Sequence, residues 1–554
     1  MSGIGGIINS NTAGQLSENM YEALKARGAD TYGTYMSKEM CLIHTGYKQS
    51  IGDKQPTRAV FGQKACVAVL DGELYNSKEL QDELAKLGHK LLDTTDAAVV
   101  AHSYMAWGKS CPERMNGNFA FAVWDGEGVF FARDHLGVCP LFYSVGSYGL
   151  VFASSIKGIL AHPQIEPIIG EEGILEILML GPGRSPTSAI FKNIKELAPG
   201  ECAYYKDELE KTTYWRLKAK PHLDNHAQTV ETVRYLLTDA VKRQATKSGR
   251  VSNLFLGGPG CIALASIAKV NSYSINFVGS PQSNDNEDAK RIILGSDELA
   301  DALVGAIEAR GLPGMADIDA ALLIFLQKIS ENAVLVSTGA DEIFGNHSWY
   351  QDEELPDTFP WAQNVEYRAS FINKDICQAS PQEYVRHRYE RAIQAASTLY
   401  DDDKNETRVR QLFNLNLGWF LQTQLSTNDS MSAKVRIRTP FLDHRLIEYM
   451  YNVPLEMKTS LLHDAFQLEK TPAREKNPLA KAQNPGYTRR VQDMLKDILH
   501  TNAPIFELVS KKALSDLLET QTINWYGQLM AYPQTIAYFL QLNAWMENYK
   551  IKLG

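Results

Sequence analysis

The chain has 554 residues, of which 44% are hydrophobic and 22% are charged, and its net charge is −9. This length exceeds one ordinary domain, and so long a chain needs neither disulfides nor a structural metal to bury a core. The acidic balance and the lack of a long basic stretch argue against nucleic-acid binding, because phosphate neutralisation requires clustered Lys and Arg.

No apolar run approaches the roughly 18 residues of a membrane span. The opening segment, MSGIGGIINS, lacks the basic flank and the apolar run of a signal peptide. The seven cysteines form no C-x-x-C pair, which argues against a disulfide framework or a zinc site. We therefore expect a cytoplasmic, multidomain protein that binds neither membrane nor nucleic acid.

The first 200 residues are rich in short β-like runs separated by Gly and Asp, which predict tight hairpins. These runs are residues 64–76, 118–125, 128–134, 140–145 and 149–156. Two helices are expected at 77–88 and 94–108, the second capped by Thr94 or Thr95. Strands in pairs with helices set apart predict an α+β layered domain, which we place at residues 1–205.

The composition changes after this domain. Residues 206–225 are charged and contain a proline, as is typical of a linker. Farther on, strands alternate with helices: apolar strands at 251–261 and 333–345 run into glycines, and a third is expected at 272–279. This alternation predicts an α/β domain with a parallel sheet over residues 226–554, whose ligands sit at the carboxyl ends of the strands. Its aromatic tail predicts a helical C-terminal part.

Several short segments, read in order, resemble those of bacterial glutamine-dependent asparagine synthetases, and together they span nearly the whole chain. Those in the first half are ARGAD (26–30), DGELYN (71–76), TTDAAVV (94–100), NGNFAFAVWD (116–125) and ARDHLGVCPLFY (132–143). Those in the second half are LFLGGPG (254–260), GADEIFG (339–345), TPFLDHRLIEYMYNVP (439–454) and NPGYTRRV (484–491). The family implies a glutaminase domain of the N-terminal-nucleophile fold, with αββα layers, which makes ammonia from glutamine. An ATP-pyrophosphatase-like synthetase domain follows it, which adenylates aspartate and lets ammonia attack it.

The resemblance implies that residue 2 is the glutaminase nucleophile, exposed by removal of Met1. The family has a cysteine there, whereas this chain has Ser2, whose hydroxyl is much harder to ionise than a thiol. The family motif N-G-E reads Asp71-Gly72-Glu73, which puts a carboxylate where an amide donor should face the developing oxyanion. We expect Ser2 to be an inert residue of the first strand and efficient glutamine hydrolysis to be lost.

Other residues match family positions that hold the substrate glutamine. Lys48 replaces the family's arginine and lacks its bidentate fork for a carboxylate. Asp96, which would bind the substrate amine, remains, as do Gly72 and Glu73 of the altered motif. Together with Ser2 and Asp71, Gly72 and Asp96 are the candidate catalytic residues of this half.

In the second half, the resemblance implies a pyrophosphate-binding loop S-G-G-x-D-S whose aspartate binds Mg²⁺. This chain has Leu256, Gly257, Gly258, Pro259, Gly260 and Cys261 there. Both serines and the aspartate are absent, and Pro259 removes a backbone donor. Cys261 is a candidate nucleophile, because the N-terminus of the following helix would lower the pKa of its thiol. The alternative is a small residue that fills the vacated loop.

Other family positions in this half have also changed. The acid/base glutamate of S-G-E-G-A-D-E is Thr338, whereas the metal-binding carboxylate Asp341 remains, as a residual site that we expect to be unoccupied. In the K-x-x-L-R segment, Thr459 replaces the phosphate-contacting lysine and His463 replaces the arginine. Thr338 and His463 are candidate catalytic groups for a new reaction, with a purely structural histidine as the alternative. Adenylyl transfer depends on positioned positive charge and metal, so these losses fall on one function.

The remaining matches fit framework roles. We expect Asp443 and Arg445 to form a structural ion pair that orders a turn. The other framework candidates are Arg27, Asp30, Arg133 and Asp134.

Three functions remain open on these grounds. The first is a repurposed enzyme that acts on an amino-acid-like or carrier-bound acyl substrate in a specialised biosynthetic pathway. The second is a non-catalytic binding or regulatory partner, for example of a paralogous synthetase, and a homodimer is also open. The third is a residual asparagine synthetase. No cofactor is expected for the first two, and ATP and Mg²⁺ are expected only for the third.

Overall fold

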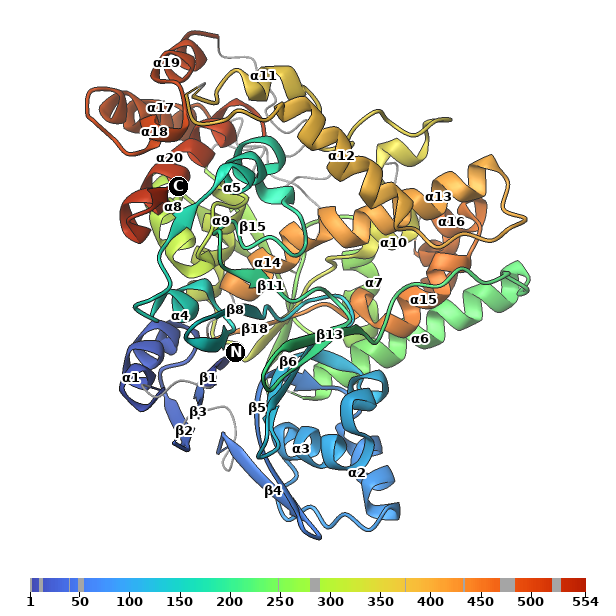
Figure 1. The fold of residues 1–554 in the computed structure, drawn as a ribbon. Coiled ribbons are helices and arrows are strands. Elements are labelled where there is room, and N and C mark those ends of the chain that lie inside the picture. Colours follow the sequence, from blue (N-terminus) through green and yellow to red (C-terminus); the bar gives the residue numbers. More distant parts are fainter. Residues whose placement is uncertain are drawn as a thin grey trace. The chain divides into compact units, whose positions relative to one another are not determined.

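The computed structural model describes residues 2–8, 13–38, 40–47, 54–247, 249–278, 289–373, 375–431, 434–468, 484–520 and 530–554. The chain forms two compact units, each with its own sheets (Figure 1). The first unit comprises Met1–Ile168 and Pro186–Arg216, and the second comprises Ile169–Ser185 and Leu217–Gly554.

The first unit contains two six-stranded antiparallel sheets, of order β11-β8-β9-β1-β3-β2 and β13-β12-β7-β6-β5-β4. The strands of the first sheet are β1 (Ser2–Ile8), β2 (Thr31–Met36), β3 (Met40–Gly46), β8 (Phe142–Gly146), β9 (Gly149–Ala153) and β11 (Lys195–Glu196). Those of the second sheet are β4 (Thr57–Phe61), β5 (Lys64–Leu74), β6 (Gly117–Trp124), β7 (Val129–Arg133), β12 (Glu201–Tyr205) and β13 (Leu209–Thr213). The five runs predicted from hydrophobicity are β5 to β9.

Two apolar cores give this unit the expected αββα layers. One core lies between the sheets, with Ile4 and Phe152 of the first sheet in the same cluster as Val69 and Phe131 of the second. The other core packs the opposite side of the second sheet against two helices, and a third helix covers the outer side of the first sheet. The helices of this unit are α1 (Ala13–Leu24), α2 (Ser77–Lys86), α3 (Asp96–Trp107) and α4 (Ile156–Leu160). Of the two candidate caps, Thr95 is the N-cap of α3.

The structure differs from the predicted linker at residues 206–225. Strand β13 occupies the first part of that range and pairs with β12 from Glu201↔Thr213 to Tyr205↔Leu209. It is the edge strand of its sheet and is largely exposed, so its side chains are charged and polar. That composition is shared by edge strands and linkers, which is why the sequence alone suggested a linker.

A second difference is that the predicted domain 1–205 is not continuous. Residues 169–185 belong to the second unit, where they form α5 (Glu171–Leu175) and the π-helical turn η3 (Glu176–Leu180). The buried carboxylate of Glu176 holds this segment, because its Oε1 accepts hydrogen bonds from the hydroxyls of Tyr384 and Ser185, both at 2.6 Å. Because Glu176 and Tyr384 are far apart in the sequence, no change in local composition indicates that residues 169–185 belong to the second unit.

The second unit is built on a parallel sheet of order β16-β15-β14-β17-β18. Its strands are β14 (Val251–Leu254), β15 (Ser272–Phe277), β16 (Lys290–Leu294), β17 (Ala333–Leu335) and β18 (Arg436–Arg438). The strand order runs outward in both directions from the adjacent pair β14 and β17, which makes their carboxyl ends the topological switch point where such sheets bind ligands. Strands β14, β15 and β17 were predicted. Strands β16 and β18 were missed because they are short and begin with charged residues.

Helices flank this sheet and form the C-terminal part, as predicted (Figure 1). They are α6 (His226–Thr246), α7 (Pro259–Ala268), α8 (Ser296–Arg310), α9 (Asp317–Lys328), α10 (Ala340–Phe344), α11 (Val365–Ala369), α12 (Pro381–Gln394), α13 (Lys404–Leu415), α14 (Leu421–Met431), α15 (His444–Asn452), α16 (Leu455–Phe466), α17 (Pro485–Leu499), α18 (Ile505–Leu508), α19 (Lys511–Thr520) and α20 (Tyr532–Tyr549). The aromatic tail packs as α20, which is buried over most of its length, and Trp545 donates its indole N–H to the carbonyl oxygen of Gly311 at 2.9 Å.

Candidate functional site

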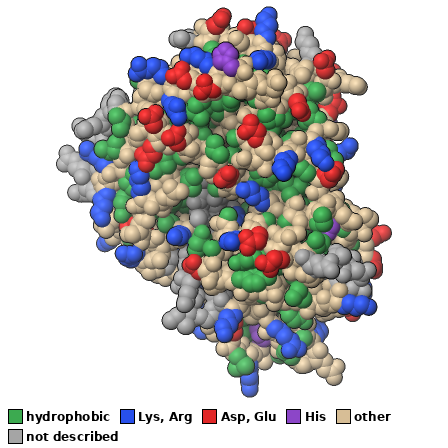
Figure 2. All heavy atoms as spheres, turned by 90° about the vertical axis from the view of Figure 1, so that its left-hand side faces the viewer, with side chains coloured by type: hydrophobic (Ala, Val, Ile, Leu, Met, Phe, Trp, Pro, Cys, Tyr) green, Lys and Arg blue, Asp and Glu red, His purple; other side chains and the backbone are tan. Residues whose placement is uncertain are grey.

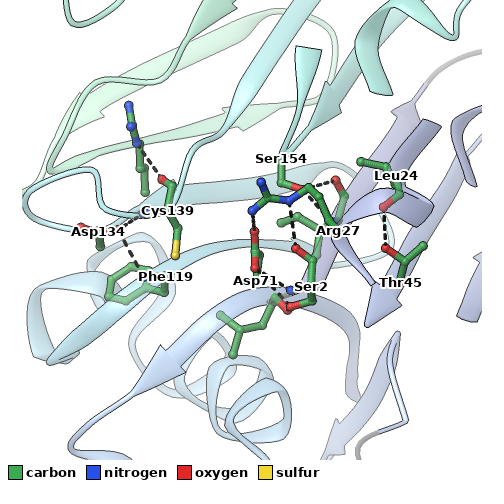
Figure 3. A network of polar contacts seen from close by, with 12 residues as sticks. Ser2, Leu24, Arg27, Thr45, Asp71, Phe119, Asp134, Cys139 and Ser154 are labelled. Carbon is green, nitrogen blue, oxygen red and sulfur yellow. Dashed lines mark hydrogen bonds and ion pairs between the residues drawn. The ribbon is translucent and has the colours of Figure 1, made fainter. Parts of the chain in front are cut away.

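Ser2 and Asp71 are in direct contact in the first unit (Figure 3). Ser2 begins β1, Asp71 lies on β5, and their exposed fractions are 7% and 1%. The Ser2 hydroxyl donates to Asp71 Oδ1 at 3.2 Å, and the Ser2 backbone nitrogen donates to the same oxygen at 3.1 Å. One carboxylate oxygen therefore holds both the candidate nucleophile and the nitrogen that would become the base once Met1 is removed.

Arg27 completes this network. Its Nη2 lies 2.7 Å from Asp71 Oδ2, and its Nε donates to the carbonyl oxygen of Ser2 at 3.2 Å. We predicted a framework role for Arg27, but the structure places it at the site. The carboxylate that replaces the family's amide donor is thus a buried acceptor, paired with a cation and hydrogen-bonded to Ser2. Such a group cannot donate to a developing oxyanion.

The other predicted glutaminase residues lie near the end of β5. Asp96 begins α3, and its Oδ2 accepts a hydrogen bond from the backbone nitrogen of Leu74 at 2.8 Å. Glu73 precedes Leu74 on the same strand. The contact of Asp96 links β5 to the start of α3, whereas Lys48 lies outside the described residues.

Gly72 has a backbone role that no other residue fills. Its φ is +111°, and a Cβ at this position would lie 2.0 Å from the carbonyl oxygen of Asn118 on the paired strand β6. Only glycine tolerates both the conformation and the close approach. Gly72 therefore shapes the strand beside Asp71. Its role is one of backbone conformation, because glycine has no side chain that could take part in the chemistry.

Restoring the thiol alone is expected to leave glutamine hydrolysis near background. In Ser2→Cys, Asp71 still lacks a donor for the oxyanion, and one such donor is worth about 10²- to 10³-fold in kcat. We expect Ser2→Cys/Asp71→Asn to exceed Ser2→Cys by about that factor in glutamate release from glutamine. Mass spectrometry must first show that Met1 is removed. Asp71→Asn alone controls for the thiol, and equal rates for the single and double variants would contradict the role given to Asp71.

Two turns meet at the switch point of the second unit. After β14 the chain turns through Gly257 and Gly258, whose φ values are +87° and +88°, and Pro259 begins α7. After β17 it turns through residues 336–339, and α10 begins at Ala340. Because β14 and β17 pair in parallel, both turns lie at the same edge of the sheet.

Small side chains fill the space between these turns. Cys261 is fully buried, and its Sγ lies 3.1 Å from Ser337 Oγ. A Cβ at Gly260 would lie only 2.7 Å from the Cβ of Ala340 and 3.2 Å from that of Ser337. The position of the family's Mg²⁺-binding aspartate therefore has no room for a side chain, and the buried Cys261 thiol fills the loop.

The remaining candidates lie on two elements. Thr338 and Asp341 follow β17, and Asp341 Oδ1 accepts a hydrogen bond from Asn346 Nδ2 at 3.3 Å. His463 lies in the last turn of α16, with Nδ1 3.5 Å from the carbonyl oxygen of Leu468. This contact ties His463 to the end of its own helix, which is a structural role.

Lys458 does not compensate for the missing phosphate-contacting lysine. It precedes Thr459 on α16, but its side chain is buried, with Nζ 4.4 Å from the centroid of the Phe413 ring on α13. Thr459 itself is exposed. Neighbouring residues on a helix point about 100° apart, so the buried amine faces away from the direction of Thr459.

The residues at the switch point do not fit ATP and Mg²⁺. Among the described residues, no group of three or more His, Cys, Asp or Glu side chains could hold a metal ion. Asp341 retains one carboxylate of the family's metal site, but the second position is Gly260, which faces Ala340. A nucleotide site needs paired carboxylates or positioned cations around the phosphates.

The predicted framework roles are confirmed for four residues. Asp443 caps α15 and binds Arg445 at 2.7 Å between Oδ2 and Nη2, and this carboxylate raises the pKa of Arg445. Asp134 accepts hydrogen bonds from the backbone nitrogens of Leu136 and Cys139. Figure 3 shows Asp134 beside Cys139. Arg133, buried beside it, donates to three carbonyl oxygens, those of Gly137, Cys139 and Leu197.

Sequence reasoning missed a carboxylate–imidazole pair after β17. Glu342 follows Asp341 on α10, and its Oε1 lies 3.2 Å from His347 Nε2. Glu342 was read only as part of the family motif. A histidine five residues later, followed by Trp349, was the available signal.

Comparisons with known proteins agree with this architecture. A family model described as a glutamine amidotransferase domain matches residues 1–215, and one described as asparagine synthase matches residues 232–547. Asparagine synthetase [glutamine-hydrolyzing] 3 of Bacillus subtilis is 33% identical, over 97% of this chain and 97% of its own length. This chain belongs to the asparagine synthetase family. Its fold is accordingly an amidotransferase domain of the N-terminal-nucleophile type, followed by a parallel-sheet synthetase domain.

More distant relatives carry different names. Asparagine synthetase [glutamine-hydrolyzing] 2 of Bacillus subtilis is 25% identical, over 92% of this chain and 74% of its own length. A Penicillium rubens protein named amidase chyE is 24% identical, over 77% of this chain and 76% of its own length. No helix of the described residues combines the length and the apolar character needed to cross a bilayer.

Proposed function

We propose that this protein is a divergent family member that has lost ATP-dependent aspartate activation and efficient glutamine hydrolysis. Its second unit instead acts on an amino-acid-like or carrier-bound acyl substrate. The observation that carries the proposal is the filled switch point, where Gly260 meets Ala340 and Cys261 meets Ser337. Pyrophosphate at this place needs backbone donors, hydroxyls and a metal, whereas Pro259 has no backbone N–H and Leu256, Gly260 and Cys261 offer neither a hydroxyl nor a carboxylate.

The first unit supports the loss of glutaminase activity independently. The Ser2 hydroxyl and backbone nitrogen both donate to Asp71, which Arg27 pairs. A nucleophile that donates to a buried carboxylate can lose its proton only by breaking that contact or by passing the proton to an anion held by Arg27. Neither arrangement leaves a donor for the oxyanion.

An acyl substrate is supported by what the family's second domain retains. Asp341 lies at the carboxyl edge of the parallel sheet, where it can face the ammonium group of an amino acid. A relative over most of the chain is named an amidase, and amide chemistry requires an acyl carbon and proton transfer but no nucleotide.

A small-molecule substrate also fits the surface better than nucleic acid does. Figure 2 shows acidic and basic side chains interspersed over the face that it draws, with hydrophobic side chains between them. Nucleic-acid binding needs cations gathered along one path. The net charge of −9 points in the same direction.

The test is nucleotide binding and turnover by the full chain. We expect calorimetry with ATP and Mg²⁺ to show heats of dilution only, and aspartate, ammonia, ATP and Mg²⁺ to yield neither asparagine nor pyrophosphate above a no-enzyme control. Asparagine synthetase [glutamine-hydrolyzing] 3 of Bacillus subtilis, purified in the same way, is the positive control. Asparagine formation that depends on ATP would overturn the proposal and leave a residual synthetase.

A further inference from the structure

The carboxylate–imidazole pair after β17 is built like an acid–base site. The Glu342 carboxylate is 3% exposed, and its Oε1 is held on two sides, by Gln424 Nε2 at 3.0 Å and by His347 Nε2 at 3.2 Å. A buried carboxylate beside one ring nitrogen fixes which nitrogen carries the proton and how the ring is turned. In the neutral ring, the Glu342 carboxylate favours the tautomer with its proton on Nε2 and its lone pair on Nδ1.

Aromatic side chains hold the imidazole plane. The His347 ring stacks on Trp349, with centroids 4.4 Å apart and an interplanar angle of 7°, and meets the edge of Phe420 at 5.2 Å. Trp349 is itself fixed, because its indole N–H donates to Asn416 Oδ1 at 3.2 Å. The His347 side chain is 14% exposed, and within the described part of the chain no residue bonds its Nδ1. The aromatic contacts therefore fix the plane of the ring and, with it, the direction in which Nδ1 points.

This pair lies on the same short stretch as the surviving family residues. Glu342 and His347 directly follow Asp341 and Asn346 in the chain, and Asp341 and Asn346 are also hydrogen-bonded to each other. The two pairs are thus carried by α10 and the turn after it, next to the turn that contains Thr338. A base here would replace the acid/base group lost at Thr338.

We propose that His347 is a general base, oriented by Glu342, for the hydrolysis of an aminoacyl thioester. This deepens the proposed function and rests on it. A thioester arrives already activated, so it needs none of the ATP chemistry that the switch point has lost. Asp341 supplies a carboxylate for the substrate's α-ammonium group.

The step balances without a further reactant. His347 Nδ1 takes a proton from water as the water oxygen bonds to the acyl carbon. The carbon–sulfur bond then breaks, and the thiolate takes up the proton from the imidazole. The products are a free amino acid and a thiol.

Thiol release from N-acetylcysteamine thioesters of aspartate and alanine tests this proposal. We expect His347→Gln to lower kcat at least about 100-fold, as is usual for loss of a general base. His387→Gln, an exposed histidine on α12, should have wild-type activity. Added imidazole should restore part of the rate in His347→Ala, which a purely structural role would not allow.

Two further variants separate the roles of the neighbouring residues. Glu342→Gln removes the carboxylate that positions the imidazole, and we expect it to shift the pH profile of kcat. Asp341→Asn should raise KM for aminoacyl thioesters but not for the acetyl thioester. Unchanged turnover in His347→Gln, or no thiol release by the wild type above that variant, would overturn this inference. Neither result bears on the calorimetric test of the proposed function.

Discussion

Replacing Lys458 with methionine is expected to raise the free energy of unfolding of the second unit by about 3 to 5 kcal/mol at pH 7. Lys458 is 1% exposed, and its Nζ has no hydrogen-bond partner among the described residues. Burial, followed by the charge of Arg410, lowers its pKa from 10.5 to about 7. Methionine has a similar shape, keeps the contact with Phe413, and needs no proton to be removed on folding.

The pH dependence has a definite sign. The folded pKa of Lys458 lies below the unfolded pKa, so between about pH 7 and pH 10.5 the unfolded chain holds a proton that the folded chain has lost. Wild-type stability should therefore rise with pH across this window relative to Lys458→Met. Below pH 7 the residue is charged in both states, and the full cost of burying it remains. The advantage of the variant is thus largest at and below pH 7 and fades toward pH 10.5.

Urea unfolding of wild type and Lys458→Met at several pH values measures this difference. Lys404→Met is the matched control, because Lys404 is 85% exposed and its pairing with Glu354 is a surface contact. We expect that control to stay within about 0.5 kcal/mol of wild type at every pH. A Lys458→Met variant that is no more stable than wild type, or a gain that does not change with pH, would contradict the assignment of a buried neutral amine.

Much of the first unit could be predicted because its strands face two cores. Strands such as β6 and β7 are strongly apolar, and the Asp and Gly residues between them are turn formers. The incorrect predictions concern segments whose position is determined by tertiary contacts. Strand β13 is charged because it is an exposed edge, and residues 169–185 leave the unit because Glu176 binds Tyr384. Neither cause is visible in a local window of sequence.

The candidate sites show the same division. The sequence identified the altered residues one by one, including Asp71, Gly260 and Thr338. It did not reveal that Arg27 lies 2.7 Å from Asp71, because the two residues are 44 positions apart. It also did not reveal that the space beside Gly260 has closed onto Ala340. Side-chain identity can be read from the sequence, whereas the closing of a gap between two loops depends on how the strands beneath them pair.

Returning the family's aspartate to position 260 is expected to destabilise the second unit by at least about 3 kcal/mol and to restore no ATP-dependent activity. The new Cβ would lie 2.7 Å from Ala340 Cβ and 3.2 Å from Ser337 Cβ. Real Cβ contacts are longer than the first of these, so α7 and α10 must move apart. The added carboxylate would also be buried at a position that now holds only a glycine, which costs more unless a metal pairs it.

Two variants separate crowding from charge. Gly260→Asp/Ala340→Gly removes the closest contact, and we expect it to recover part of the lost unfolding free energy but no asparagine formation. Gly418→Asp is the matched control, because a Cβ at Gly418 meets nothing within 4 Å, and it should cost much less. Urea unfolding, together with calorimetry against ATP and Mg²⁺, provides both readouts. The contrary result would be a Gly260→Asp variant that is as stable as Gly418→Asp and binds ATP together with Mg²⁺. The switch point would then have to be open, because a closed one has no room for the aspartate side chain or for the phosphates.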